Sequence, residues 1–238
     1  MRPLTLLGKL YLIPTTLGEM EPTDVLPATI KRTLDFIDTY IVENEKVARK
    51  FIKSINPEIK QNTLKIEVLD KHNDQLNYEA FLQPCLSGKN IGLMSDAGCP
   101  AVADPGAIVV GLAHKKHIQV VPLVGPSSIL LALMASGLNG QSFAFNGYLP
   151  IDISQQKTAL KALEKIAKDK NQTQIFMDTP YRNNKLFDNV IQSLQPHTKL
   201  CIACDITLPT EYIKTLSIQE WKKNKVDFHN RPAIFLVL

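Results

Sequence analysis

The chain has 238 residues, 45% of them hydrophobic and 21% charged, which is the composition of a globular protein and excludes extended disorder. Its formal net charge of +4 permits contact with a polyanion, but no lysine or arginine run is long enough to form a binding tail. The N-terminal residues lack the pattern of a signal peptide, and glycine and proline interrupt the uncharged stretch 118–151 before it reaches the roughly 20 residues of a membrane span, so we expect a cytoplasmic protein without membrane contact.

Along the chain, short apolar runs alternate with longer segments of helical period, which favours βα units and largely parallel pairing. The first half of the chain shows this alternation clearly. The expected strands are 10–13, 39–42, 65–69, 91–95 and 118–124. The expected helices are 28–37, 45–55 and 108–116, the last of them opened by a capping sequence at 104–106. This half of the chain therefore predicts one doubly wound α/β domain.

The second half continues with a helix at 127–136 and long helices at 155–168 and 183–194. The expected strands lie near 142–145, 174–177, 199–204 and 233–238. We place the domain boundary so that residues 1–123 form an N-terminal α/β domain and residues 124–238 a C-terminal α/β domain. No composition-biased linker separates the two, so we expect them to share an interface and a ligand-binding cleft.

Cysteine and histidine residues form no recognisable site. Four cysteines are too few and too scattered for a disulfide framework in a chain of this length. Cys201 and Cys204 have CxxC spacing, but they fall inside an expected strand and no second CxxC completes a zinc site. The five histidines are isolated, and there is neither a GxSxG motif nor a nucleophilic pair. We therefore predict reduced thiols, no metal ion and no covalent catalysis.

The loops after the first and fourth expected strands are candidate ligand loops, because open α/β sheets bind ligands beyond the carboxyl ends of their strands. Residues 14–18 read Pro-Thr-Thr-Leu-Gly and contain neither GxGxxG nor GxxxxGK[ST], which argues against ordinary NAD or ATP binding. Residues 95–106 carry two glycines and two prolines, which let a ligand approach the backbone closely. A structural turn would have a similar composition, and Asp96 favours the binding interpretation.

Polar groups also gather at the start of helix 127–136 and at strand ends. Gly125-Pro126-Ser127-Ser128 supplies hydroxyls and free N–H groups that favour a polar ligand atom, although Ser127 would serve equally as an ordinary N-cap. For a single acid at a strand end, the role of strand terminator or helix cap is the more common one. Together, four such acids predict an acidic rim that could hold ribose hydroxyls or accept a proton: Asp70, Asp96, Asp178 and Asp205.

Segments spread over nearly the whole chain resemble one family. The strongest are SDAGxP at 95–100 and GPSS at 125–128, supported by residues 10–18, 104–106 and 147–150. Residues 176–182 and 231–238 match the same family less closely. On these segments the chain resembles the tetrapyrrole methylase superfamily, and within it the ribosomal RNA small subunit methyltransferase I group of cytidine 2′-O-methyltransferases.

The resemblance implies a fold of two α/β domains with S-adenosylmethionine bound in the cleft between them. It also implies a homodimer, which is usual in the family. The positions that match the cofactor contacts of the family are Pro14, Asp96, Ala97, Gly98, Cys99, Val102, Ser127, Ser128, Met177, Ile206, Pro232 and Ala233.

The match weakens in two motifs on the acceptor side. Where the RNA methyltransferase group has Glu-Asp-Thr-Arg, residues 43–46 of this chain are Glu-Asn-Glu-Lys. Where the group has Arg-Glu-Leu-Thr-Lys-x-His-Glu, residues 204–211 are Cys-Asp-Ile-Thr-Leu-Pro-Thr-Glu. Only one of the replaced basic residues is again a base, and phosphate contacts dominate RNA affinity. The departures therefore bear on the acceptor more than on the cofactor.

We predict an S-adenosylmethionine-dependent methyltransferase that modifies an RNA ribose 2′-hydroxyl of the 16S ribosomal RNA cytidine type, with ribosomal RNA or the small ribosomal subunit as partner. One alternative is a tetrapyrrole or other small acceptor, and another is a cofactor-binding module without turnover. In-line methyl transfer depends mainly on alignment of the reactants, with modest help from a base. Asp96 and Asp205 are the predicted catalytic residues, as base or as orienter of the acceptor hydroxyl.

Overall fold

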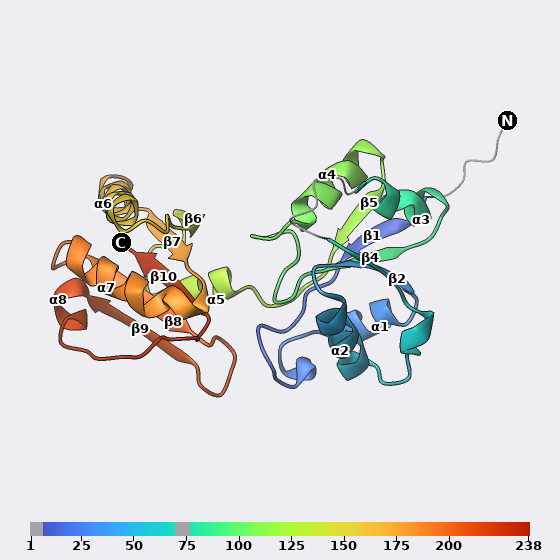
Figure 1. The fold of residues 1–238 in the computed structure, drawn as a ribbon, viewed down its shortest axis with the longest axis horizontal. Helices are drawn as coiled ribbons and strands as arrows, with labels where there is room; N and C mark the ends of the chain where they lie inside the picture. Colours follow the sequence, from blue (N-terminus) through green and yellow to red (C-terminus); the bar gives the residue numbers. More distant parts are fainter. Residues whose placement is uncertain (1–6, 70–76) are drawn as a thin grey trace. The chain divides into compact units, whose positions relative to one another are not determined.

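The computed structural model describes residues 7–69 and 77–238. The chain divides into two compact units, Met1–Pro126 (unit 1) and Ser127–Leu238 (unit 2), as Figure 1 shows. The boundary expected at 123/124 falls in the segment that joins the last strand of unit 1 to the first helix of unit 2. Among the described residues no helix is both long and apolar enough to cross a membrane. The predicted strand-end acid Asp70 lies outside the described residues.

The sheet of unit 1 is entirely parallel, in the order β3-β2-β4-β1-β5. Its central strands β2 and β4 are buried along their whole length, whereas the edge strands are partly exposed, as a sheet covered on both faces requires. The five predicted strands of this half are confirmed. Their bounds are β1 (Lys9–Leu12), β2 (Thr39–Val42), β3 (Lys65–Val68), β4 (Ile91–Met94) and β5 (Gln119–Pro122).

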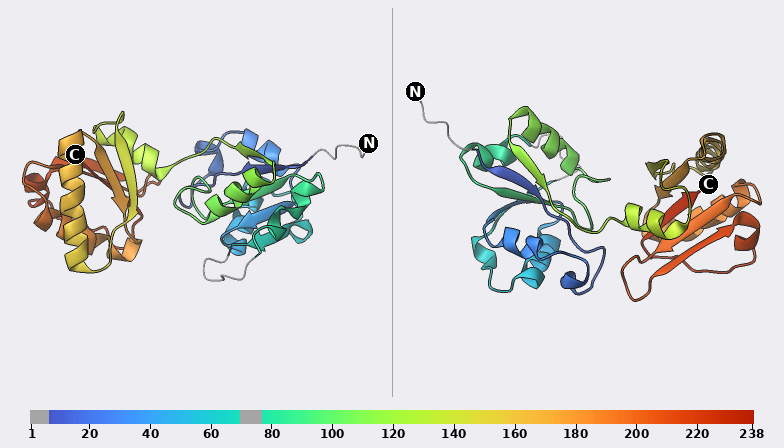
Figure 2. Two further views of the ribbon diagram at one scale, coloured as in Figure 1. Left: turned by 90° about the horizontal axis from the view of Figure 1, so that it is seen from above. Right: turned by 180° about the vertical axis from the view of Figure 1, so that it is seen from behind.

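Helices cover both faces of this sheet (Figures 1 and 2). Alternate residues of β2 separate the two layers: Tyr40 and Val42 pack with α1 and α2, whereas Ile41 packs with α3 and α4. Helix α2 begins where the Asn44 side chain accepts hydrogen bonds from two first-turn N–H groups. The helices are α1 (Thr29–Leu34), α2 (Glu45–Ile55), α3 (Gln83–Leu86) and α4 (Gly106–Lys115), with 3₁₀ turns η1 (Pro22–Asp24), η2 (Gln61–Thr63) and η3 (Ala80–Leu82).

The sheet of unit 2 is mixed, in the order β6-β7-β10-β8-β9. Only β6 and β7 pair in parallel, and the other three pairings are antiparallel. The expectation of largely parallel pairing is therefore wrong for this unit, because the last strand inserts between β7 and β8 in the opposite direction and a hairpin adds β9. The strands are β6 (Phe143–Tyr148), β7 (Thr173–Met177), β8 (Lys199–Cys204), β9 (Tyr212–Ser217) and β10 (Ala233–Val237).

The main core of unit 2 lies between this sheet and helices α6, α7 and α8, with Trp221, Phe187 and Phe235 among its largest members. Helix α5 contacts β8, β9 and β10. Ile234 and Leu236 alternate along β10 with the residues of that core and are buried on the other face of the sheet. The helices are α5 (Ser128–Ser136), α6 (Ile153–Lys170), α7 (Asn183–Ser193) and α8 (Ile218–Trp221), with the 3₁₀ turn η4 (Pro180–Arg182).

Candidate functional site

Three loops of unit 1 meet at the carboxyl edge of the parallel sheet, because β4, β1 and β5 are adjacent strands. We call residues 14–18, 95–106 and 123–126 the unit 1 loop cluster. The Thr15 N–H donates to the Gly98 carbonyl at 3.0 Å, which joins the loops after β1 and β4. The Cys99 Sγ lies 3.4 Å from the Pro126 carbonyl oxygen, which joins the loops after β4 and β5. The cluster is thus held together largely by main-chain groups.

Two glycines allow these loops to approach one another. Gly98 has a φ of +75°, and a Cβ there would lie 3.1 Å from Leu17 Cδ2 and 3.3 Å from the Pro126 carbonyl oxygen. A Cβ on Gly125 would lie only 2.3 Å from the Cβ of Pro14. Larger residues at either position would force the loops apart. Gly98, which was predicted to let a ligand approach the backbone, is thus required by contacts between the loops themselves.

The loop from Cys99 to Gly106 has a strained backbone. Ala101 and Ala103 both have positive φ, of 66° and 62°, which L-residues adopt at a free-energy cost. Asp104 holds the conformation, because its Oδ1 accepts hydrogen bonds from the Ala101 N–H at 2.9 Å and the Gly106 N–H at 2.7 Å. Val102, between the two strained residues, is 49% exposed. This loop therefore presents an apolar side chain and main-chain groups in a fixed geometry.

A pocket of about 470 Å³ adjoins this cluster. It lies between the loop after β1 and helix α2, and Asp96 and Ala97 form part of its wall. Both of these residues are exposed. The volume falls within the range of small-molecule sites, which is about 300–1,000 Å³. The lining residues are Thr15, Thr16, Leu17, Gly18, Glu19, Met20, Pro22, Val47, Lys50, Phe51, Ser54, Asp96 and Ala97.

In unit 2, three strand ends meet at one edge of the sheet, which we call the unit 2 edge. Met177 at the end of β7 is in register with Ile234, and Cys204 at the end of β8 is in register with Ala233. The Asp205 N–H donates to the Pro232 carbonyl at 2.9 Å. The antiparallel course of β10 therefore brings together residues that are far apart in the sequence.

The unit 2 edge also carries strain and unsatisfied hydroxyls. Asp205 and Thr207 have φ values of +50° and +73°, and positive φ is especially unfavourable for a β-branched residue such as threonine. The hydroxyls of Thr179 and Thr207 are buried without a hydrogen-bond partner among the described residues. Buried polar atoms are normally satisfied, so these two hydroxyls indicate a place where a polar ligand completes the structure.

The acids of the unit 2 edge are paired with arginine, which modifies the expectation of an acidic rim. Asp205 is only 6% exposed, and its Oδ2 accepts hydrogen bonds from Arg231 Nε at 2.7 Å and Thr210 Oγ1 at 2.9 Å. Asp178 accepts from Arg182 Nε at 2.7 Å. Charge-assisted bonds of this kind hold a carboxylate firmly and leave less of it for a ligand. The pairing of Asp205 has no local sequence signal, because its partner Arg231 is 26 residues away.

Ser127 and Ser128 begin helix α5 as predicted. Ser127 is the N-cap, and its side chain accepts a hydrogen bond from the Leu130 N–H at 3.5 Å. The capping role anticipated for Ser127 is therefore confirmed, and Ser128 is the first residue of the helix.

The cysteines are not arranged as nucleophiles. Burial raises the pKa of the half-buried Cys99 thiol, and burial also raises the pKa of Cys204, to about 11. Cys201 and Cys204 are both buried within β8, as the strand interpretation of their CxxC spacing predicted. A thiol with a raised pKa has little thiolate at neutral pH, and the thiolate is the reactive form.

Comparison with known proteins decides the family. The model of the tetrapyrrole (corrin/porphyrin) methylases matches residues 23–222. The chain belongs to the tetrapyrrole methylase family. It is therefore a methyltransferase, as the resemblance implied, and the resemblance to the ribosomal RNA small subunit methyltransferase I group is confirmed.

Relatives of this tetrapyrrole methylase include two proteins named ribosomal RNA small subunit methyltransferase I. The protein of Vibrio cholerae is 30% identical over 89% of this chain and 69% of its own length. That of Buchnera aphidicola is 28% identical over 97% of this chain and 79% of its own length. The crystal structure of the methyltransferase CobJ matches with a TM-score of 0.64 at 16% identity, over 97% of this chain and 93% of that one, and so supports the fold.

The predicted cofactor residues of this tetrapyrrole methylase gather within each unit. Unit 1 brings six of them into the loop cluster, and unit 2 brings four to its edge. The residues present fit a nucleoside-like cofactor, because a pocket of about 470 Å³ adjoins the loop cluster and the threonine hydroxyls of the unit 2 edge that have no partner among the described residues offer polar groups. The residues are Pro14, Asp96, Ala97, Gly98, Cys99 and Val102 in unit 1 and Met177, Ile206, Pro232 and Ala233 in unit 2.

Sequence reasoning missed several residues that shape these places. Thr15 joins two loops through its main chain, but nothing in the sequence marks that role. Thr207 is strained and unsatisfied, and its β-branched side chain gives no warning of a positive φ. Residues 104–106 were expected to open a helix, and α4 begins at Gly106 after its N-cap Pro105. Sequence reasoning did not foresee that Asp104 also holds the strained residues of the loop.

Proposed function

We propose that this methyltransferase binds S-adenosylmethionine at the unit 1 loop cluster and transfers the methyl group to a ribose 2′-hydroxyl of ribosomal RNA. The observation that carries the proposal is the convergence of three loops around Gly98 and Gly125, where main-chain groups lie next to a pocket of about 470 Å³. The relatives named ribosomal RNA small subunit methyltransferase I support the choice of acceptor. A homodimer in the cytoplasm belongs to the same proposal.

The cofactor would supply an electrophilic methyl on its sulfonium. On transfer, the O–CH₃ bond would form as the S–CH₃ bond breaks, and the hydroxyl proton would pass to a base of the chain. The chain contributes by holding the acceptor in line and by excluding water, effects that dominate reactions of this type. Burial raises the pKa of Cys99, which disfavours the thiolate form of this residue.

Asp96 is the better placed of the two predicted acids to accept the proton. It is exposed, it follows β4 and it forms part of the pocket wall. Asp205 is buried, and its carboxylate is engaged by Arg231 and Thr210, which favours a positioning role. We therefore assign the base to Asp96 and the positioning of the segment after β8 to Asp205.

The test is methyl transfer from labelled S-adenosylmethionine to small ribosomal subunits isolated from a strain that lacks this activity. The expected result is label in a single cytidine ribose of the RNA. Cofactor binding without label in the RNA would contradict RNA methylation and would leave either a small acceptor or a binding module without turnover. A parallel incubation with a tetrapyrrole separates these two cases.

A further inference from the structure

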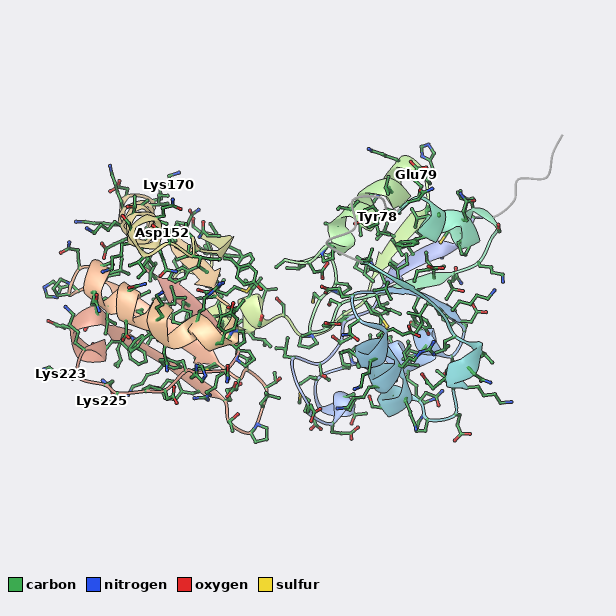
Figure 3. All side chains as sticks on the ribbon, viewed as in Figure 1. Tyr78, Glu79, Asp152, Lys170, Lys223 and Lys225 are labelled. Atoms are coloured by element: carbon green, nitrogen blue, oxygen red, sulfur yellow. The ribbon has the colours of Figure 1, made fainter. Side chains whose placement is uncertain are left out.

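Helix α6 carries a one-sided stripe of lysines. The helix has 18 residues, Ile153–Lys170, and follows its N-cap Asp152. Asp152 and Lys170 are labelled in Figure 3. Lys157, Lys161, Lys165 and Lys168, which we call the α6 lysine stripe, follow one another at intervals of four, four and three residues. With about 100° of rotation per residue, all four fall within an arc of about 80°, over a length of about 16 Å.

The stripe lies beside the face by which α6 packs. Leu160, Leu163 and Ala167 are buried. Lys161, Lys165 and Lys168 are exposed. None of these three forms an ion pair within the described residues, and Lys157 donates only to the Gln192 side chain at 3.3 Å. The three cations are therefore available to a partner.

Neither acid of the helix, Glu164 or Asp169, forms an ion pair with the stripe within the described residues. Glu164 lies at the border of the arc, but its Oε1 accepts hydrogen bonds from the Gln195 N–H and the Thr198 hydroxyl, in the segment between α7 and β8. Like charges three or four residues apart destabilise a helix. A stripe that is kept despite this cost is a local conflict of the kind that marks functional surfaces.

The charge of the chain is unevenly distributed between the units. Residues 1–126 contain fourteen lysines and arginines and fourteen aspartates and glutamates, whereas residues 127–238 contain thirteen and nine. The whole net charge of +4 therefore belongs to unit 2. Helix α6 alone contributes five lysines against two acids, which is +3 of that total.

We propose that the α6 lysine stripe contacts phosphates of the RNA acceptor and adds affinity away from the reacting ribose. The proposal rests on the proposed function, which makes RNA the acceptor. Lysine ammonium groups bind phosphate as mobile point charges, and a linear row of them matches a backbone that carries one negative charge per nucleotide. The stripe holds the RNA and leaves alignment at the unit 1 loop cluster unchanged.

The experiment compares two triple variants of the full-length protein. K161E/K165E/K168E reverses the stripe. K222E/K223E/K225E makes the same charge change in the same unit, and Lys223 and Lys225 lie on the side of unit 2 away from α6 (Figure 3). Binding to small ribosomal subunits lacking the modification, and to the RNA extracted from them, is measured between 50 and 200 mM salt together with S-adenosylmethionine affinity and kcat. K161Q/K165Q/K168Q repeats the test without added like-charge repulsion.

The stripe variants are expected to bind both the subunits and the naked RNA at least tenfold more weakly at 100 mM salt. Their slope of log K against log salt should be shallower by about two to three, since each lost phosphate contact removes about 0.7–0.9. The cofactor affinity and the kcat at saturating subunit stay unchanged, and the control stays within threefold of the parent.

Equal losses of RNA affinity in the stripe and control variants would contradict RNA binding by the α6 lysine stripe and would leave the proposed function intact. A loss with subunits but not with naked RNA would also overturn it, because it would indicate an acidic protein partner. If the parent protein binds RNA through the stripe but methylates none, the proposed function is contradicted and RNA binding by the stripe is supported. If the parent does not bind RNA at all, both fail.

Discussion

The two units of this methyltransferase place ligand-binding groups by different means. In unit 1 all strands run in parallel, so the loops after β4, β1 and β5 emerge at the same edge and contact one another through main-chain groups. In unit 2 the reversed strand β10 brings its first residues beside the last residues of β7 and β8. In a parallel sheet the loops that follow adjacent strands meet at one edge. In the mixed sheet, the start of one strand meets the ends of two others.

The unit 1 loop cluster and the unit 2 edge also differ in the groups that hold their conformations. In unit 1, close contacts at Gly98 and Gly125 and the Asp104 carboxylate hold the loops. At the unit 2 edge, arginine pairs hold Asp178 and Asp205. Substitutions in unit 1 should therefore act mainly on ligand binding, and substitutions of the unit 2 acids should act mainly on stability.

The largest expected effect is that of Gly98→Val. The residue has a φ of +75°, and its Cβ would meet Leu17 and a main-chain oxygen at 3.1 and 3.3 Å, so a β-branched side chain must displace the loop. We expect S-adenosylmethionine affinity to fall at least about 100-fold, which corresponds to about 3 kcal/mol, in calorimetric titrations.

The matched control is Gly111→Ala, in helix α4 of the same unit, where an added Cβ meets nothing within 4 Å. It should leave cofactor affinity unchanged and stabilise the protein by up to about 1 kcal/mol, the helix propensity difference. Equal cofactor affinity in folded Gly98→Val and in the control would remove the loop from the site.

Asp96→Asn and Asp205→Asn should separate activity from stability. The exposed Asp96 should lose about 100-fold or more in methyl transfer with an unchanged melting temperature, as expected for a base. Loss of the buried Asp205 leaves Arg231 without its carboxylate and should cost about 1–3 kcal/mol of stability. Trp221, the single tryptophan, is buried in unit 2 and reports unfolding of that unit by fluorescence. Normal stability of Asp205→Asn combined with loss of activity would reverse the assignment of roles.

Much of unit 1 could be predicted from the sequence, because its strands are apolar runs and its helices carry clear periodicity. Glycine and proline marked the loop after β4 as a turn or a binding loop, and Asp96 and the SDAGxP segment favoured binding. Two glycines, at 98 and 125, then proved to mark close contacts between loops.

The pairing direction in unit 2 could not be predicted in this way. The alternation of residues along β10 is the same whether it pairs in parallel or antiparallel, so nothing in its sequence reports its direction. Strand β9 went unrecognised because it is a half-buried edge strand with Lys214 and Thr215 in its centre. The partner of Asp205 is fixed by tertiary structure alone.

A smaller effect concerns pH and strand β8. Burial raises the pKa of Cys204 to about 11, above that of a thiol in the unfolded chain, so the folded state keeps a proton that the unfolded state loses. The contribution of this thiol to stability is therefore complete below about pH 9 and falls by about 1.4 kcal/mol per pH unit from there to about pH 11. Denaturant titrations followed by Trp221 fluorescence should show this decline. Cys204→Ala should make the decline shallower without abolishing it, because burial also raises the pKa of Cys201 in the same strand. An identical slope in that variant would contradict the assignment.

The smallest expected effect is relief of backbone strain at Thr207. Its φ of +73° is readily adopted by glycine, so Thr207→Gly should stabilise unit 2 by about 1 kcal/mol at most. Its affinity for S-adenosylmethionine should stay unchanged, because the cofactor is assigned to unit 1. Asn171→Gly, at the left-handed C-cap of α6, is the control, and it should be stabilised less because asparagine adopts a positive φ more readily than threonine. A Thr207→Gly protein no more stable than this control in denaturant titrations would contradict strain at Thr207.

The most direct test of the central claim, that the cofactor binds at the unit 1 loop cluster, is protection of Cys99 from alkylation. Cys99 is the half-buried thiol of that cluster, whereas Cys85, Cys201 and Cys204 are buried. Because its pKa is raised by burial, labelling is measured at about pH 9, where more thiolate is present. The account predicts that micromolar S-adenosylmethionine slows alkylation of Cys99 at least about tenfold, with half-protection at the calorimetric Kd. An unchanged rate at millimolar cofactor would contradict it.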